Sequence, residues 1–213
     1  MTAKYRFVFF DVDSTLVTIE GIDELADGNP EIARLTAAAM NGEIPLDRVY
    51  AERLELIRPT RAQVDALGQR YLDTIVDGAA ETIDTLKRAG VHVQLVSAGI
   101  AQAIAPLAQR LGVAATHAVA LQFDEDGLYV DFDRRSLLTK VGGKELVVRA
   151  LLSRSKGKSA FIGDGVSDLE TKGLVDLFIG FGGVVSRPRV KENADVFVDQ
   201  PTLAAILPYL IEN

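Results

Sequence analysis

Short apolar runs that end abruptly in polar residues recur along this chain, and they constrain its fold more than any other feature. The first run, Tyr5–Phe10, is followed directly by the polar stretch Asp11–Thr15. A short run that is apolar at nearly every position is typical of a strand buried on both faces. Four later runs have the same form, namely Val91–Val96, Ala115–Ala120, Ser159–Ile162 and Leu177–Ile179.

Helical patterns separate most of these runs. Clear examples cover Ala79–Ala89, Ile100–Leu111, Lys144–Leu152 and Leu203–Ile211. Because strands that alternate with helices form βαβ units, the sequence predicts an α/β protein with a doubly wound parallel sheet.

Two segments interrupt this alternation. Residues 17–75 are rich in Ala, Glu, Arg and Leu at helical spacing and contain no strand-like run. We interpret them as a helical cap inserted into a core made of residues 1–16 and 76–213. In Leu121–Asp133, the turn residues Asp124–Gly127 separate two short alternating segments, which predicts a small β-hairpin flap.

Charge and composition exclude several classes of protein. The 213 residues carry a formal net charge of −7 and include no cysteine, so disulfides and thiolate metal sites are excluded. Nucleic acid is not an expected partner, because its binding requires clustered basic residues. The opening apolar run is too short for a signal sequence or a membrane span, so we expect a cytoplasmic protein.

Polar side chains follow three of the predicted strands. Asp11 follows the first, Ser97 follows Val91–Val96, and Gly163–Asp168 follow Ser159–Ile162. Ligands of an open parallel sheet bind beyond the carboxyl ends of its strands. We therefore expect these three polar sets to meet in one crevice.

The first set contains two carboxylates in the pattern DxDxT. Asp11 is placed to attack phosphorus and to hold the phosphoryl group as an acyl phosphate. Asp13 is placed to protonate the leaving oxygen and later to deprotonate water, which requires a raised pKa. The alternative is an Asx-turn or capping cluster that only opens the loop.

Two further sets offer groups that can hold phosphate. Ser97, Ala98 and Gly99 are expected at the start of a helix, where a hydroxyl and N–H groups can bind phosphate oxygens, although Ser97 could be a plain N-cap. Two glycines precede Lys144, which can neutralise the transferring phosphoryl group. Alternatively, Lys144 is an ordinary surface lysine.

The fourth set reads GDGxxD. Asp164, together with Asp11, would supply the carboxylates that Mg²⁺ prefers, and Asp168 could hold metal-bound water or Lys144. A tight turn is the alternative. Four converging carboxylates, those of Asp11, Asp13, Asp164 and Asp168, would repel one another unless a divalent cation and a lysine compensated them, so we expect Mg²⁺ as cofactor.

These motifs, in this order, resemble the haloacid dehalogenase superfamily and, within it, the phosphoserine phosphatases. The resemblance covers nearly the whole chain and includes FDVDST, EGIDELA, ERLELI, GDGVSDLE and FIGFGG. It implies a Rossmannoid core and hydrolysis of O-phospho-L-serine to L-serine and phosphate, the last step of serine biosynthesis. It also implies that Asp11 is the nucleophile and Asp13 the general acid and base, that Asp11, Asp164 and the Asp13 carbonyl bind magnesium, and that Ser97 and Lys144 hold phosphate.

The resemblance also implies residues that recognise a small-molecule substrate. Glu20 would receive the ammonium group and Arg53 the carboxylate, whereas without the resemblance both would be interpreted as solvated charges. Met40 and Asn41 would line the pocket, and Arg187 would lie near it. The sequence leaves open whether the protein is a monomer or a homodimer.

The chain departs from the family pattern at Ala98 and Asn41, where glycine is usual, and at Ser167, where Asn or Thr is common. We expect His92 and His117 to be structural. Three alternative functions stay open at this point: transfer of the phosphoryl group to another alcohol such as homoserine, hydrolysis of another small phosphorylated metabolite, and a phospho-accepting receiver domain.

Overall fold

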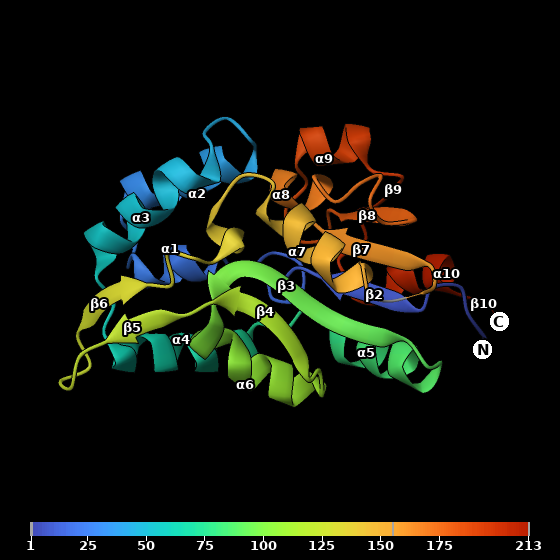
Figure 1. Cartoon of the computed structure of the whole chain (residues 1–213), viewed down its shortest axis with the longest axis horizontal. Helices are drawn as coiled ribbons and strands as arrows, with labels where there is room; N and C mark the ends of the chain where they lie inside the picture. Colours follow the sequence, from blue (N-terminus) through green and yellow to red (C-terminus); the bar gives the residue numbers. More distant parts are fainter. Residues whose placement is uncertain (1, 155, 213) are drawn as a thin grey trace.

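The computed structural model describes residues 2–154 and 156–212, and a six-stranded sheet runs through them (Figure 1). The strand order is β4-β3-β2-β7-β8-β9, and all neighbouring strands are parallel. This is a doubly wound order that reverses between β2 and β7, which confirms the predicted fold class. The strands are β2 Phe7–Phe10, β3 His92–Ile100, β4 Ala115–Val119, β7 Ser159–Gly163, β8 Leu177–Phe181 and β9 Val196–Val198.

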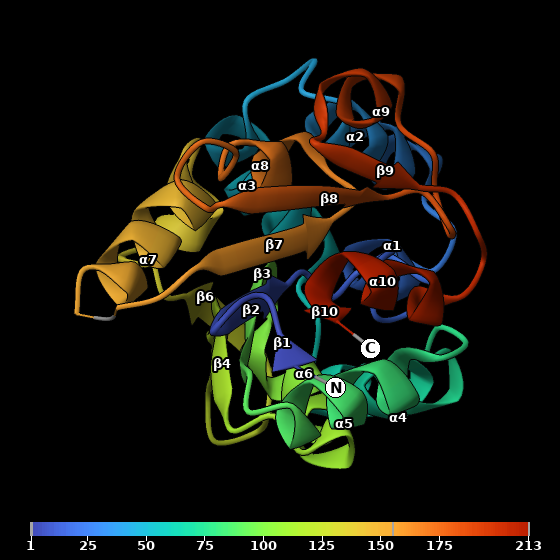
Figure 2. The same cartoon turned by 90° about the vertical axis from the view of Figure 1, so that its right-hand side faces the viewer.

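Helices cover both faces of this sheet (Figures 1 and 2). Helices α5 (Ala79–Arg88) and α6 (Ala101–Leu111) lie on one side. Helices α7 (Gly143–Leu152), α8 (Val166–Leu169) and α9 (Pro188–Asn193) lie on the other. Since both faces are covered, the central strand β2 is apolar and buried at every position.

The register of the two central strands fixes where their loops begin. Phe10 of β2 lies opposite Ile162 of β7, and the rings of Phe9 and Phe161 stack at a centroid distance of 6.4 Å. The chain therefore leaves both strands at the same level of the sheet, about 5 Å apart in the hydrogen-bonding direction.

Residues 17–75 leave and rejoin the sheet at one point, where Val17 and Ile75 form an isolated antiparallel bridge. Between them lie four helices and no named strand among the described residues. Helix α4 packs along α6 of the core (Figure 1). The four helices are α1 Gly21–Leu25, α2 Pro30–Met40, α3 Leu46–Ile57 and α4 Arg61–Asp73.

The predicted hairpin is confirmed. Strands β5 (Leu121–Phe123) and β6 (Tyr129–Phe132) are antiparallel, and Gly127 in their turn has a positive φ of 78°. The hairpin contacts the helical segment, because the Gly127 carbonyl accepts a hydrogen bond of 2.8 Å from the Arg61 N–H.

The last part of the chain differs from the prediction. Instead of one helix there are a 3₁₀ turn η2 (Leu203–Ile206), a short helix α10 (Leu207–Leu210) and an extended end β10 (Ile211–Glu212). β10 pairs with β1 (Thr2–Ala3), which brings the two described ends together. Pairing with another strand thus overrides helical spacing at Ile211.

One helix also begins later than predicted. Strand β3 continues through Ser97–Gly99 to Ile100, and α6 starts at Ala101 with Ile100 as its N-cap. The ladder between β3 and β4 is irregular between Val96 and Ile100, so this part of β3 departs from its neighbour. Ser97 is therefore neither a helix N-cap nor part of a helix start. A second 3₁₀ turn, η1, covers Leu137–Thr139.

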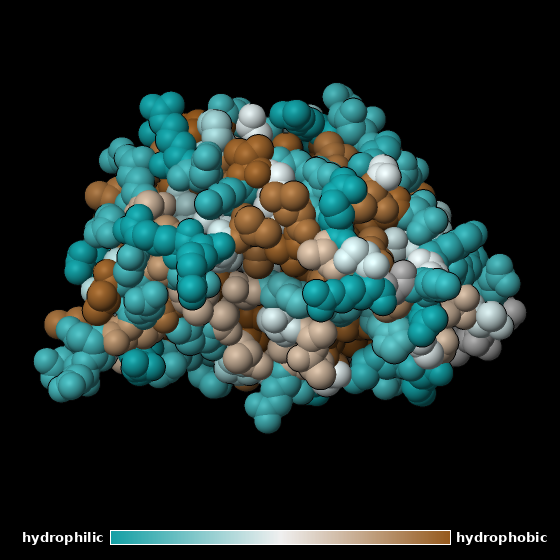
Figure 3. All heavy atoms as spheres, in the orientation of Figure 1, coloured by the Kyte–Doolittle hydropathy of each residue, from teal (hydrophilic) through white to brown (hydrophobic). Residues whose placement is uncertain are grey.

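Figure 3 shows mainly hydrophilic side chains on one face of the molecule, with hydrophobic side chains gathered near its centre. Among the described residues, no helix has the length and apolar character needed to cross a membrane.

Candidate active site

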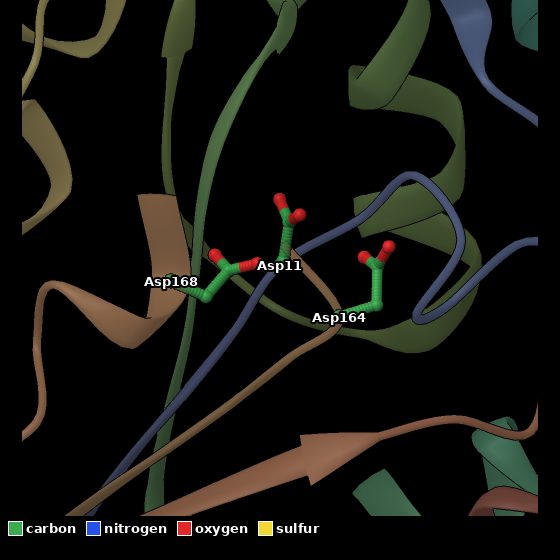
Figure 4. A group of neighbouring side chains, drawn as sticks. All are labelled: Asp11, Asp164 and Asp168. Carbon is green, nitrogen blue, oxygen red and sulfur yellow. The ribbon is translucent and has the colours of Figure 1, made fainter. Parts of the chain in front are cut away.

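Asp11 and Asp164 meet where the strand order reverses, one directly after β2 and the other directly after β7. The Asp11 N–H donates to the Ile162 carbonyl at 3.0 Å, which ties the two loops together. Both side chains are almost fully buried. Their carboxyl groups point to the same side, and that of Asp168 points toward Asp11 (Figure 4). One oxygen from each of the three lies within 4.8 Å of the others, a spacing and a donor type that suit a divalent cation.

Lys144 lies between two of these carboxylates. Its Nζ is 2.5 Å from Asp168 Oδ1 and 2.9 Å from Asp11 Oδ1. The contact with Asp11 is an ion pair, and this buried oxygen has no hydrogen-bond donor among the described residues. Asp168 is engaged on both sides, because its Oδ2 accepts the Gly165 N–H at 2.9 Å. Asp168 therefore orients Lys144, which also forms an ion pair with Asp11 Oδ1.

Burial sets the pKa values of this pair. Burial raises the pKa of the Asp168 carboxyl to about 8, and the charge of Asp11 adds to the rise. Burial would lower the pKa of Lys144, but the Asp11 and Asp168 carboxylates outweigh it and raise that pKa. Lys144 thus carries its positive charge against Asp11.

Arg187 lies against Asp164 and not in the pocket described below. Its Nε donates to Asp164 Oδ2 at 2.9 Å, and Thr15 Oγ1 donates to Asp164 Oδ1 at 3.2 Å. A second guanidinium nitrogen lies 3.3 Å from Glu20. Burial, with the charge of Glu20 adding to it, raises the pKa of Asp164 to about 7.

One carboxyl oxygen of Asp13 accepts two hydrogen bonds. Its Oδ1 accepts from the Tyr71 hydroxyl at 2.6 Å and from the Gly21 N–H at 2.9 Å. Burial raises the pKa of Asp13 to about 7; the Tyr71 hydrogen bond acts against this rise and the charge of Asp11 adds to it. A carboxyl group with this pKa can both give and take a proton near neutral pH, as the acid and base role requires.

The Ser97–Gly99 segment lines the same site as Asp13. Ser97 is buried, and its Oγ accepts the Gly99 N–H at 3.0 Å. A Cβ atom at position 99 would lie 2.8 Å from Asp13 Oδ2, so glycine is needed there. Ala98 is tolerated in place of the usual glycine, and its carbonyl accepts the Tyr50 hydroxyl at 2.9 Å.

A pocket opens between these strand ends and the helical segment. Nine residues that the sequence pointed to line it, and helices α1 to α4 add several more. The nine are Asp11, Asp13, Glu20, Met40, Arg53, Ser97, Ala98, Gly99 and Lys144.

The two charged residues from the helical segment have different surroundings. Glu20 accepts the Ser14 hydroxyl at 2.6 Å, and burial raises the pKa of Glu20 to about 8. Arg53 is only 4% exposed. One of its terminal nitrogens donates to Thr36 at 3.0 Å, whereas its Nε has no partner among the described residues. The interpretation of Arg53 as a solvated charge is therefore wrong.

Asn41 does not line the pocket. It ends α2 in a right-handed conformation, with its Oδ1 3.5 Å from Arg187. Gly42, the next residue, takes the left-handed conformation with a φ of 74°, so Asn41 itself does not require glycine.

Sequence reasoning missed two tyrosines, Tyr50 and Tyr71, that line the pocket. Ser167 also lines it. Helical spacing made both tyrosines look like ordinary core residues. The histidines have no place in the site: His92 is an exposed residue stacked on Phe7 rather than a buried one, and His117 contacts Gln94.

Comparisons with known proteins agree with this geometry. The family model for haloacid dehalogenase-like hydrolases matches residues 8–171. Human phosphoserine phosphatase is 37% identical over 197 residues, which cover 90% of this chain and 88% of the human protein. A solved phospho-aspartyl intermediate analogue of phosphoserine phosphatase has a TM-score of 0.85 at 28% identity and covers 98% of this chain and 100% of that one. A substrate-bound phosphoserine phosphatase has a TM-score of 0.85 at 27% identity, with coverages of 98% and 99%. The chain therefore belongs to the haloacid dehalogenase-like hydrolases and, within them, to the phosphoserine phosphatase family.

Proposed function

We propose that this chain hydrolyses O-phospho-L-serine to L-serine and phosphate through a phosphoaspartate on Asp11. One observation carries the proposal: the same pocket has a carboxylate beside a lysine at the strand ends and an acid and an arginine from the helical segment. Phosphoserine offers matching groups, which are a phosphate ester, an ammonium and a carboxylate.

In the first step, an Asp11 oxygen forms a bond to phosphorus while the bond from phosphorus to the serine oxygen breaks. The electron pair of that bond goes to the serine oxygen, which takes a proton from Asp13. Lys144 and the Ser97 hydroxyl, which both line the pocket, would bind the phosphoryl oxygens as their charge redistributes.

In the second step, water attacks phosphorus and the bond from phosphorus to Asp11 breaks. Asp13, now a carboxylate, takes the proton that the water loses. Asp11 and Asp13 thereby return to their starting protonation states, and phosphate leaves.

The carboxylates fit Mg²⁺ as the cofactor. Asp11 has a buried oxygen without a hydrogen-bond donor among the described residues, and oxygens from three buried acids cluster within 4.8 Å. We propose that Asp11, Asp164 and the Asp13 carbonyl hold the ion, and that Asp168 holds Lys144. Bound Mg²⁺ would offset the charge of the phosphoryl group and the carboxylates.

Glu20 and Arg53 would recognise the zwitterion. Arg53, buried with its Nε free, can grip the carboxylate through parallel hydrogen bonds, and Glu20 can accept the ammonium group. Met40 would pack on the serine methylene. Arg187 would act indirectly, by holding the side chains of Asp164 and Glu20 through hydrogen bonds.

We also propose that residues 17–75 form a cap domain over a core of residues 1–16 and 76–213, of which residues 1, 155 and 213 lie outside the described residues. The Val17–Ile75 bridge, where the segment joins the core, supports this division. Cytoplasmic location, and the choice between monomer and homodimer, stay predictions.

The function is tested with a panel of phosphorylated metabolites, in which phosphate release is measured with Mg²⁺ and with a chelator. Phosphoserine should be the preferred substrate, and chelation should abolish its turnover. Asp11→Asn should leave no measurable turnover, because an amide cannot form the acyl phosphate. Substantial release by that variant would remove Asp11 as nucleophile, and a clear preference for another ester would remove phosphoserine as substrate.

A further inference from the structure

Tyr71 is a fully buried residue of α4 whose hydroxyl reaches out of the helical segment to the core. Its Oη lies 2.6 Å from Asp13 Oδ1, and the Gly21 N–H, 2.9 Å away, donates to the same oxygen. Oδ1 thus accepts two hydrogen bonds from groups that the fold holds rigidly.

The other oxygen of Asp13 faces the pocket. A Cβ atom built on Gly99 would lie 2.8 Å from Asp13 Oδ2 and 3.2 Å from Ser97 Oγ. Oδ2 therefore lies on the side of the segment expected to bind the phosphoryl oxygens. The two oxygens of one carboxyl group have different surroundings, with donors at Oδ1 and the reaction space at Oδ2.

We propose that Tyr71 is a positioning residue that holds the Asp13 carboxyl group by Oδ1, so that Oδ2 faces the leaving group. An oxygen that already accepts two hydrogen bonds has both lone pairs engaged, so Oδ2 is the oxygen left to exchange a proton with the serine oxygen. When the ester bond breaks, the proton passes from Oδ2 to the serine oxygen, and Oδ1 keeps both of its donors. This inference rests on the proposed function.

Gly21 makes room for this hydroxyl. A Cβ atom at position 21 would lie 2.0 Å from Tyr71 Oη, so any side chain there must displace the hydroxyl from Asp13. The small residue and the tyrosine thus form one unit, joined by their shared acceptor.

Tyr50 provides a matched control. It is a second buried tyrosine of the same segment, and its hydroxyl donates across to the core at 2.9 Å. Its acceptor, however, is the Ala98 carbonyl and not the acid. Tyr50→Phe therefore removes a comparable hydroxyl contact between segment and core without touching Asp13.

The test compares the kcat/KM of Tyr71→Phe and Tyr50→Phe on three substrates. Phosphoserine releases a strongly basic alkoxide that needs a proton, whereas acetyl phosphate and 4-nitrophenyl phosphate release stable anions that need none. We expect the kcat/KM of Tyr71→Phe to fall about tenfold more on phosphoserine than on the other two substrates, mainly through kcat. The kcat/KM of Tyr50→Phe should fall by the same factor on all three substrates. Thermal melting confirms that both variants fold.

Gly21→Ala is the second variant. It should reproduce the selective loss of Tyr71→Phe, and the double variant should lose little more than either single one. Equal losses on all three substrates for Tyr71→Phe would overturn the inference and leave the proposed function intact. If the unaltered enzyme hydrolysed none of the three substrates, the proposed function would be overturned, and the inference with it.

Discussion

Arg53 uses only part of its hydrogen-bonding capacity. A guanidinium has five N–H donors, yet the described contacts of Arg53 include one hydrogen bond, to Thr36, and its buried Nε has no partner. Burying a charged group in this state is unfavourable, and burial lowers the pKa of Arg53. A ligand carboxylate would satisfy the remaining donors, which is why we assign this role to Arg53.

Arg53→Ala should therefore weaken turnover of phosphoserine far more than turnover of phosphoethanolamine, which lacks only the carboxylate. A charged hydrogen-bonded pair contributes about 1.5–3 kcal/mol, so we expect a loss of about tenfold to a hundredfold in kcat/KM on phosphoserine. Steady-state kinetics on both esters measures the difference. Equal losses on both would mean that Arg53 supports the fold and does not recognise the carboxylate.

At this scale the sequence was informative where a residue type has few alternative uses. Clustered acids after buried strands predicted the positions of Asp11 and Asp164 correctly. Tyr71 could not be predicted as a partner of Asp13, because a tyrosine at helical spacing looks like core and its contact is made across the cap interface. Arg187 was expected near the substrate pocket, and it contacts Glu20 of the pocket; its pairing with Asp164 was not predicted, because the two residues are far apart in sequence.

Two glycines show how the same residue type acts differently in neighbouring strands. Gly163 of β7 and Gly180 of β8 are direct partners in the sheet, and neither has a positive φ. A Cβ atom on Gly163 would lie 2.3 Å from Asp168 Cγ, whereas one on Gly180 would lie 2.8 Å from Val190. The first glycine makes room for an acid of the site, and the second makes room for the packing of α9.

Alanine at each position should separate these roles. Gly163→Ala must move Asp168, which holds Lys144, so kcat should fall by at least about tenfold. Gly180→Ala overpacks the core, which typically costs about 1–3 kcal/mol, so its melting temperature should fall by several degrees while kcat stays near the unaltered value. Calorimetry and steady-state kinetics on both proteins measure the two effects. Identical profiles for the two variants would contradict the distinction.

Elements were predictable to the extent that their own residues determine them. The buried central strands are continuous apolar runs and the amphipathic helices have a strong periodic signal, and their predicted positions are nearly correct. The last strand of the sheet, β9, was not predicted; its three residues lie between Asp195 and Asp199. The extended course of Ser97–Gly99 depends on the irregular ladder between β3 and β4, which no local signal reveals.

For the molecule as a whole, the chief electrostatic feature is a buried excess of negative charge on a chain that is already acidic. Five carboxylates gather around the pocket and outnumber Lys144, Arg53 and Arg187; they belong to Asp11, Asp13, Glu20, Asp164 and Asp168. Burial and mutual repulsion raise the pKa values of Asp13, Glu20, Asp164 and Asp168 to about 7 or 8. Without a cation, the fold thus favours their protonated forms.

The metal-free protein should consequently become less stable as the pH rises. A carboxyl group whose folded-state pKa is raised keeps its proton in the folded protein after the unfolded chain has lost it, so stability declines from about pH 4 to about pH 8. The lowered pKa of His117 acts in the opposite direction, but for one group only. The melting temperature of chelator-treated protein should be lower at about pH 8.5 than at about pH 5.5.

Mg²⁺ binds the deprotonated carboxylates, so adding it should raise the melting temperature more at the higher pH. Asp164→Asn, which removes one buried acid and one proposed ligand, should weaken both the decline and the rescue by Mg²⁺. A melting temperature of the chelated protein that is flat or rises across this range would contradict the buried excess of negative charge.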